Sequence, residues 1–294
     1  MPNMSMKKNP MPTQTPDERS RNFKEVALGY TREQATDEAQ RCLNCKNMPC
    51  VSGCPVHIAI PKFIHEVAQG DFEAAYKTLT ASSSLPAVCG RVCTHPCERH
   101  CRRSQVDEPL AICSIKRFVG DIALSGAFEV PDEVPLKPTG KRVAVIGAGP
   151  SGLTCAYYLT QLGHQVDVYE AEQVPGGVLY WGIPEYRLPK AIVDDEIAQI
   201  AALGVEMKNN VRIGKDVTLE QLKASHDAVV VAIGAWTSMK LSCPGSDLNG
   251  VWGGIDFLGQ VALGNRPEIG RSVAVVGGGN TAMDACRTAV RLGA

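Results

Sequence analysis

Long apolar runs are missing from this 294-residue sequence, and so is any marked excess of charge. No uninterrupted apolar stretch approaches the ~20 residues that a membrane-spanning helix needs, so we expect no membrane segment. The net charge of −1 excludes the broad electrostatic field that attracts nucleic acid or an anionic membrane. Residues 1–20 are polar and lack the apolar core of a secretory signal. These absences predict a soluble, cytoplasmic protein.

Cysteine, by contrast, is plentiful: the chain has twelve, and nine lie between Cys42 and Cys113. Without a sign of secretion, C-x2-C spacing indicates metal or redox chemistry rather than disulfides. The run from Cys42 to Pro55 has the plan of a bacterial ferredoxin run, C-x2-C-x2-C-x3-C-P, with two extra residues before Cys50. In that plan Cys42, Cys45 and Cys50 bind one four-iron cluster, and Cys54 binds a second.

The later cysteines supply the remaining ligands. The available thiolates are Cys93, Cys97, Cys101 and Cys113. Eight cysteines then serve two [4Fe–4S] clusters, and one of the nine is spare. Structural zinc is the alternative, because it also uses C-x2-C pairs. The two cysteine pairs of a zinc site are usually separated by about a dozen residues or more, and Cys54-Pro55 has no role in such a site. The spacing therefore favours an iron–sulfur cluster.

The first 130 residues show no alternating strand pattern. We expect a flexible arm over residues 1–20 and helices over residues 23–40, 60–69 and 71–79. Residues 1–130 are therefore predicted to form a largely helical domain that folds around its metal. Prolines and a glycine over residues 131–140 predict a linker.

Beyond the linker, strands alternate with helices, which indicates a parallel α/β sheet. The expected strands lie at 143–146, 165–169 and 228–233, and the expected helices at 150–162 and 191–203. After a second linker at 242–254, residues 273–292 hold one further strand and helix. A single strand and helix cannot bury an apolar face. We expect this sequence to be part of a longer polypeptide.

The first glycine-rich turn follows a strand and opens a helix, with the form G-x-G-x-x-G. Such a turn places a dinucleotide pyrophosphate on the helix N-terminus. The candidate ligand residues are Gly147, Gly149, Pro150, Ser151 and Gly152. Glu170 ends the next strand, where its carboxylate accepts bonds from a ribose.

The segment from Gly176 to Pro189 favours FAD as the dinucleotide, because its glycines and aromatics suit a loop laid along a long flat ligand. Its candidate FAD contacts are Gly177, Leu179 and Arg187. A surface hairpin without a ligand is the alternative for this segment. Residues 141–254 are thus predicted to be a Rossmann-like FAD-binding domain.

A second turn, G-x-G-x-x-A, again joins a strand to a helix. Its candidate contacts with NADPH are Gly277, Gly279, Asn280, Thr281 and Ala282. Residues 255–294 are therefore predicted to begin a second Rossmann-like domain, for NAD(P)H. Two dinucleotide turns are what flavin-mediated hydride transfer requires. The residue that reads the adenosine ribose is expected after Ala294, so the sequence does not separate NADH from NADPH.

Together these motifs resemble the small (beta) subunit of glutamate synthase and its relatives over essentially the whole chain. The segments that carry the resemblance are 22–30, 41–45, 85–93 and 182–184. The family also includes the NADPH-oxidising end of dihydropyrimidine dehydrogenase and the large subunit of ferredoxin:NADP transhydrogenases. The resemblance implies FAD, NADPH and two [4Fe–4S] clusters as cofactors.

The resemblance also implies how the cysteines divide. One cluster would be held by Cys42, Cys45, Cys50 and Cys101, and three corners of the other by Cys54, Cys93 and Cys97. The family uses Gln or Glu as the fourth corner, where this chain has Lys116, and a cationic lysine cannot ligate. Cys113 is the expected substitute. Cys89 matches a family cysteine that is not a ligand. The spacing from Cys93 to Cys97 is two residues shorter than in well-known members.

The implied activity is electron input. NADPH gives a hydride to FAD, and electrons pass singly through the clusters to a large redox subunit of the glutamate synthase alpha type. Equivalent modules of a dihydropyrimidine dehydrogenase or a transhydrogenase are the alternatives, and a zinc-bound interaction module without redox activity is the alternative from another class. We also expect NADPH not to reduce the flavin of this 294-residue chain at a useful rate.

Overall fold

The computed structural model describes residues 3–128, 137–239 and 241–294. Their contacts separate two units: of the described residues, those up to 14 and those from 27 to 128 belong to the first, and 15–26 and those from 137 onward belong to the second. The segment Thr15–Val26 thus packs with the second unit, although it lies inside the expected 1–130 domain. Of the expected linker, residues 131–136 lie outside the described residues. No helix in the described residues is long and apolar enough to cross a membrane.

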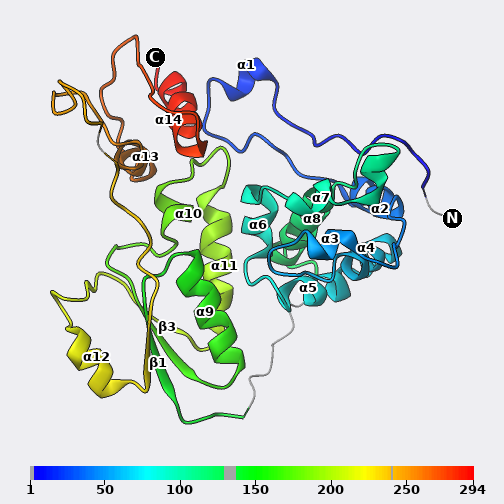
Figure 1. The fold of residues 1–294 in the computed structure, drawn as a ribbon, viewed down its shortest axis with the longest axis horizontal. Helices are drawn as coiled ribbons and strands as arrows, with labels where there is room; N and C mark the ends of the chain where they lie inside the picture. The colour runs from blue at the N-terminus through cyan, green and yellow to red at the C-terminus, as the bar shows by residue number, and fades with distance from the viewer. Residues whose placement is uncertain (1–2, 129–136, 240) are drawn as a thin grey trace. The chain divides into compact units, whose positions relative to one another are not determined.

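The first unit is helical, as its sequence predicts (Figure 1). Its elements are α2 (Arg32–Gln40), α3 (Pro49–Ser52), α4 (Ile60–Gln69), α5 (Phe72–Thr80), α6 (Pro86–Val92), α7 (Pro96–Arg99), the 3-10 helix η1 (Arg102–Gln105) and α8 (Ile112–Leu124). Local signals explain the boundaries. Gly70 ends α4 with a positive φ, and the Asp71 side chain accepts a hydrogen bond from the Ala74 N–H to start α5.

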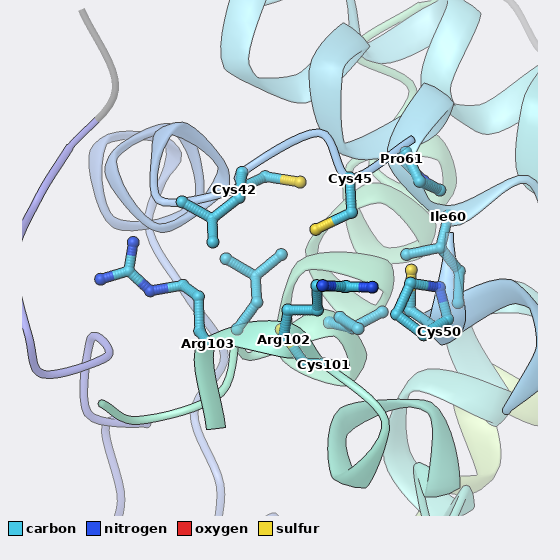
Figure 2. A pocket seen from close by; sticks show the side chains of 12 residues that line it. Cys42, Cys45, Cys50, Ile60, Pro61, Cys101, Arg102 and Arg103 are labelled. Carbon is cyan, nitrogen blue, oxygen red and sulfur yellow. The ribbon is translucent and has the colours of Figure 1, made fainter. Parts of the chain in front are cut away.

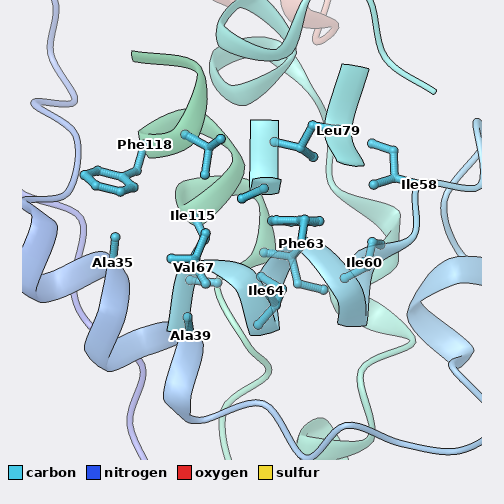
Figure 3. Packing of buried hydrophobic residues seen from close by; sticks show 14 of the residues in the cluster. Ala35, Ala39, Ile58, Ile60, Phe63, Ile64, Val67, Leu79, Ile115 and Phe118 are labelled. Carbon is cyan, nitrogen blue, oxygen red and sulfur yellow. The ribbon is translucent and has the colours of Figure 1, made fainter. Parts of the chain in front are cut away.

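A large apolar core lies among α2, α4, α5 and α8 of this unit (Figure 3). Phe63, Ile64 and Val67 point into it from α4, and Leu79 and Ile115 reach it from α5 and α8. All five side chains are fully buried. Full burial of one such side chain stabilises the fold by about 1.5–3 kcal/mol, so the core is a large part of what holds the cysteine-bearing loops in place.

Two expectations for this unit need correction. The helix expected over residues 23–40 is confined to Arg32–Gln40, because Thr31 caps its first turn and Gly29, with a φ of +85°, interrupts the chain before it. The first part of the N-terminal arm, expected to be flexible, is bound to the unit. The Asn3 N–H donates to the Gln40 carbonyl at 3.0 Å, and the fully buried Arg41 donates to the Ser5 carbonyl at 3.0 Å.

The second unit contains a four-stranded parallel sheet in the order β3-β2-β1-β4. Its strands are β1 (Arg142–Ile146), β2 (Gln165–Tyr169), β3 (Glu206–Lys208) and β4 (Ala228–Val231). Its helices are α1 (Pro16–Arg19), α9 (Pro150–Gln161), α10 (Val178–Trp181), α11 (Lys190–Ala202), α12 (Leu219–Ser225), α13 (Gly254–Ala262) and α14 (Asn280–Arg291). This Rossmann-like order confirms the predicted fold class.

Helices cover both faces of the sheet (Figure 1). Ala144 and Ile146 of β1 pack with Leu222 of α12 on one face. Val145, on the other face, lies beside the start of α9 at Gly152. The alternation of strand side chains between the two faces explains why β1 is apolar throughout.

The strand expected at residues 273–276 is not formed. Val273 and Val276 lie in irregular backbone, with 42% and 72% of their surface exposed. A strand needs a neighbour to take its backbone hydrogen bonds, and none of the described residues supplies one here. The following turn and helix α14 are formed as predicted.

Candidate cofactor sites

Four cysteines of the first unit surround one cavity (Figure 2). They are Cys42, Cys45, Cys50 and Cys101, and the cavity between them has a volume of about 30 Å³. The structure therefore brings together the four thiols that the family resemblance assigns to one cluster. Cys101 lies more than fifty positions from Cys42 in sequence. Arg103 of η1 donates a hydrogen bond to the Arg41 carbonyl at 2.9 Å, which holds η1 beside the residue before Cys42 and brings the two thiols together.

Local geometry and charge shape this first thiol group. Met48 adopts a left-handed conformation and Pro49 starts α3, so the chain turns sharply just before Cys50. Burial raises the pKa of Cys50 to about 11, and burial likewise raises the pKa of Cys42. A thiol with a raised pKa stays protonated at neutral pH, and it releases its proton when a metal binds the sulfur in the proton's place. Arg103 lines the same cavity and is paired with Asp107.

A second thiol group forms where α6 packs on α8. Its members are Cys54, Cys93, Cys97 and Cys113. Cys97 interacts electrostatically with Cys54 and Cys93, and Cys93 in turn interacts with Cys113. A hydrogen bond from the Cys113 thiol lowers the pKa of Cys93 to about 5, while burial raises the pKa of Cys97 to about 12. Cys113 is buried, and its sulfur also lies 3.4 Å from the Gly90 carbonyl oxygen. These are the four thiols expected around the second cluster.

The thiols of the first group stand around a cavity and do not converge on one point. Within residues 3–128, 137–239 and 241–294, no three His, Cys, Asp or Glu side chains are arranged to hold a single metal ion. A four-iron cluster places its thiolate ligands at separate corners, and the first group has that form around its cavity. The donor set, four thiols per group, fits such a cluster.

The first nucleotide turn has the close contacts that its glycines predict. A Cβ at Gly152 would lie 1.9 Å from the Gly147 carbonyl oxygen, and Gly147 itself has a φ of +103°. Gly149 begins α9 and has open space beside it, because a Cβ at this position would meet nothing closer than Gly177 Cα at 3.8 Å. A glycine has no side chain to bond the first N–H groups of α9, so these remain available to an anion.

The acid and the following segment lie at this same turn. The buried Glu170 carboxylate accepts hydrogen bonds from the N–H groups of Ala148, at 2.8 Å, and Glu172, at 2.9 Å. The Gly176 N–H donates to the Ala148 carbonyl at 2.8 Å. The segment after Gly176 is therefore anchored to the turn and is no free surface hairpin. The site residues Pro150, Ser151, Gly177 and Leu179 lie in α9 and α10 or next to them, around this turn.

The second turn also has the predicted form. Gly277 has a φ of +125°, and Gly279 begins α14 without a side-chain cap. Asn280, Thr281 and Ala282 form the first turn of that helix, with Asn280 and Thr281 exposed. The fit to a dinucleotide phosphate is the same as at α9: uncapped backbone N–H groups at the N-terminus of a twelve-residue helix.

Arg187, expected among the FAD contacts, makes an ion pair within the protein. Its guanidinium pairs with the Asp284 carboxylate of α14 at 2.5 Å. Beside it the Tyr186 hydroxyl donates to the Asp284 carbonyl at 3.0 Å, and Arg291 stacks over the Tyr186 ring at 3.8 Å. The segment after α10 is thus bound to α14 through Tyr186 and Arg187. The sequence offers a weak signal for this, because Asp284 follows the second turn within the helix. In the structure only 3% of the Asp284 surface is exposed.

Sequence reasoning missed Lys190. Its ammonium donates to the carbonyls of Leu179, at 3.0 Å, and Ile183, and so fastens α10 to the start of α11. Burial lowers the pKa of Lys190 to about 8. A lysine at the first position of a helix carries no sequence signal for such a role, because the carbonyls it binds belong to the backbone.

Comparison with known families matches both halves of the chain. Residues 19–127 match the family described as dihydropyrimidine dehydrogenase domain II, 4Fe-4S cluster. Residues 141–294, more than half of the chain, match the pyridine nucleotide-disulphide oxidoreductase family. The chain belongs to this family. Residues 141–294 form its domain of this family, an iron–sulfur domain precedes them, and the cofactors of the chain are FAD, NADPH and 4Fe–4S clusters.

Curated relatives of this oxidoreductase are similar along most of its length. The beta subunit of NADP(+)-dependent formate dehydrogenase from Moorella thermoacetica is 43% identical over 84% of the chain and 38% of the relative. NADPH-Fe(3+) oxidoreductase subunit beta from Geobacter sulfurreducens is 40% identical over 93% of the chain and 42% of the relative. The glutamate synthase [NADPH] small chain of Azospirillum brasilense is 35% identical over 97% of the chain and 62% of the relative. The chain thus spans less than two thirds of each.

Proposed function

We propose that this chain is the electron-input module of a multisubunit oxidoreductase. It oxidises NADPH through FAD and delivers the electrons through two [4Fe–4S] clusters to a large partner subunit of the glutamate synthase type. The observation that carries the proposal is the gathering of two sets of four thiols in a chain that also has two uncapped nucleotide turns. The division into residues 1–130, 131–140, 141–254 and 255–294 belongs to the same proposal.

Each part of the chain has a defined task in this function. The N–H groups at the start of α9 bind the FAD pyrophosphate, and Glu170 faces its ribose. The first turn of α14 binds the pyrophosphate of NADPH. Cys42, Cys45, Cys50 and Cys101 hold one cluster. Cys54, Cys93, Cys97 and Cys113 hold the other. When bound, FAD accepts two electrons as a hydride and releases them singly, and the clusters carry single electrons.

The type of the partner subunit is proposed from the similarity to known proteins. Similarity to the glutamate synthase small chain supports a large subunit of that type, which the electrons would reach for glutamate formation. A formate dehydrogenase partner is the second candidate, because the beta subunit from Moorella thermoacetica has the higher identity, 43%. The proposal includes a cytoplasmic location. All twelve cysteines are free thiols, and a reducing compartment keeps thiols in that form.

The test is anaerobic purification of the natural full-length polypeptide with whatever subunit accompanies it. We expect bound FAD, iron and sulfide, and EPR signals of reduced clusters on addition of NADPH. Mass spectrometry of the accompanying subunit then separates a glutamate synthase type from a formate dehydrogenase type. Protein without flavin, or with clusters that NADPH leaves oxidised, contradicts the electron-input function whatever the partner is.

A further inference from the structure

Lys116 is a lysine buried next to the second thiol group. It lies on α8 with 7% of its surface exposed. In the described part of the chain, no carboxylate lies within 4 Å of its ammonium. Burial of a charged ammonium without a counter-charge is very unfavourable, so buried lysines are normally paired. The position therefore requires an anion that is not a side-chain carboxylate.

The packing of α6 on α8 determines what surrounds this lysine. A Cβ at Gly90 would lie 2.4 Å from Arg117 Cα, and a Cβ at Gly120 would lie 2.6 Å from the Ala87 nitrogen. Only glycines at these two positions allow the helices to approach so closely. Cys93 directly follows α6, so this packing brings its thiol to the face of α8 that carries Cys113.

Lys116 shares that face with Cys113, because residues three apart in a helix are neighbours. Its ammonium interacts with the thiols of Cys93, Cys97 and Cys113, and also with Cys89. One other buried charge lies close by. The Glu98 carboxylate accepts a hydrogen bond from the Cys113 N–H at 2.9 Å. The ligand thiolates and Glu98 would all be negative, and Lys116 is a buried positive charge that interacts with three of these ligands, Cys93, Cys97 and Cys113.

The first thiol group has a different electrostatic environment. Arg103 lines its cavity but is paired with Asp107, and the buried Arg41 behind it is paired with Glu38 at 2.7 Å. These two arginines are already neutralised by their own carboxylates. Arg102 also lines the first cavity but is exposed to solvent. The two groups of thiols thus differ in one respect that matters for electron transfer: only the second has a buried cation, Lys116, for which no carboxylate partner lies in the described residues.

We propose that Lys116 is the built-in counter-charge of the second cluster and raises its reduction potential. Four thiolates outweigh the charge of an oxidised four-iron core, and reduction adds a further negative charge, so a fixed cation stabilises the reduced form more than the oxidised one. The lysine acts as a positioning charge and does not ligate. The inference rests on the proposed function and on its assignment of Cys54, Cys93, Cys97 and Cys113 to one cluster.

The experiment is an EPR-monitored redox titration of the anaerobic full-length holoprotein and its variants. Lys116→Met removes the charge and keeps most of the side-chain volume. It is expected to lower the midpoint potential of one cluster and leave the other unchanged. Lys116→Arg keeps the charge and is expected to stay near the wild-type value. Glu98→Gln removes a negative charge and is expected to shift the same cluster in the opposite direction. The matched control is Lys62→Met, whose lysine on α4 is 68% exposed.

If a variant loses a cluster, its potential cannot be measured, and the iron content of the variants then provides the test. Loss of half the iron in Lys116→Met, with full iron in Lys116→Arg, also supports the counter-charge. Loss of iron in both variants makes Lys116 a packing residue and overturns the inference, as does an unchanged potential in Lys116→Met. In that last case a wild-type protein with about eight iron atoms leaves the proposed function standing. Wild-type protein without iron overturns both.

Discussion

A single residue at the first nucleotide turn tests the proposed FAD site. Gly152→Ala would place a methyl group 1.9 Å from the Gly147 carbonyl oxygen, so the turn must open. We expect the variant to purify without stoichiometric FAD, as measured by flavin absorbance after release. Gly259→Ala is the control, because a Cβ there meets nothing closer than 3.9 Å. Full flavin content in Gly152→Ala would show that the turn tolerates this opening.

The two cysteines of α6 and α8 have different expected roles. Cys113 is proposed as a ligand and Cys89 as the spare thiol, although both lie near Lys116. Cys113→Ser is expected to lose or convert one cluster, whereas Cys89→Ser should keep both. Iron analysis and EPR distinguish these outcomes. The reverse pattern would assign the ligand role to Cys89.

Asp167, in the middle of β2, ties the sheet to α12. Its buried carboxylate accepts a hydrogen bond from His226 Nε2 at 2.7 Å and pairs with Arg142 at 2.7 Å. Burial alone would raise the pKa of Asp167, but these contacts and Lys208 outweigh it and hold the pKa below its usual range. A lowered pKa means that the carboxylate stabilises the fold above about pH 4 and that this contribution disappears as the pH falls through the folded-state pKa.

Asp167→Asn is therefore expected to reduce the free energy of unfolding of the second unit by about 1–3 kcal/mol at pH 7. The difference from wild type should shrink below about pH 4. Urea unfolding followed by tryptophan fluorescence measures this unit alone, because Trp181, Trp236 and Trp252 all belong to it. Asp247→Asn, on an exposed loop, is the control. An equal difference at both pH values would exclude the carboxylate as its source.

At the scale of elements, α14 is held by the segment that follows α10. Arg187 covers the Asp284 carboxylate, whose side chain is only 4% exposed and whose Oδ1 has no partner in the described residues. Burial raises the pKa of Asp284, which shows how unfavourable the site is for an unpaired charge. The second nucleotide turn lies at the start of this same helix, so the ion pair also determines where that turn points.

Arg187→Met should lower the free energy of unfolding of the second unit by about 1–3 kcal/mol, because it leaves a buried carboxylate unpaired. Adding Asp284→Asn should recover part of the loss, since the unpaired charge is then gone. Urea unfolding of the single and double variants gives the coupling, with Arg271→Met at an exposed position as the control. A double variant less stable than Arg187→Met would contradict the pairing.

The elements that sequence predicted well are those whose signals are local. Thr31 and Gly70 lie beside the ends of their helices, and β1, α9 and β2 occur where alternation and periodicity place them. The strand expected at residues 273–276 shows the limit. Its apolar pattern is as strong as that of β1, but a strand exists only when a second strand accepts its hydrogen bonds. The sequence of residues 273–276 does not show whether such a second strand is present.

At the scale of the whole molecule, the two thiol groups predict the metal content. Anaerobically purified protein is expected to be brown and to contain about eight iron atoms with matching sulfide, because eight thiolates hold two four-iron clusters. Iron and acid-labile sulfide analysis checks this directly. Stoichiometric zinc without sulfide would favour the interaction-module alternative.

The sequence by itself determined the chemistry of the parts: thiolates at cluster spacing, and two glycine turns that each open a helix. Both depend on residues within a few positions of one another, so the local chain is enough. The tertiary structure decided which parts meet. It brought Cys101 to Cys42, placed Lys116 among the thiols, set Arg187 on Asp284 and joined Thr15–Val26 to the second unit. These contacts link residues distant in the chain, and they form because core packing brings the helices together.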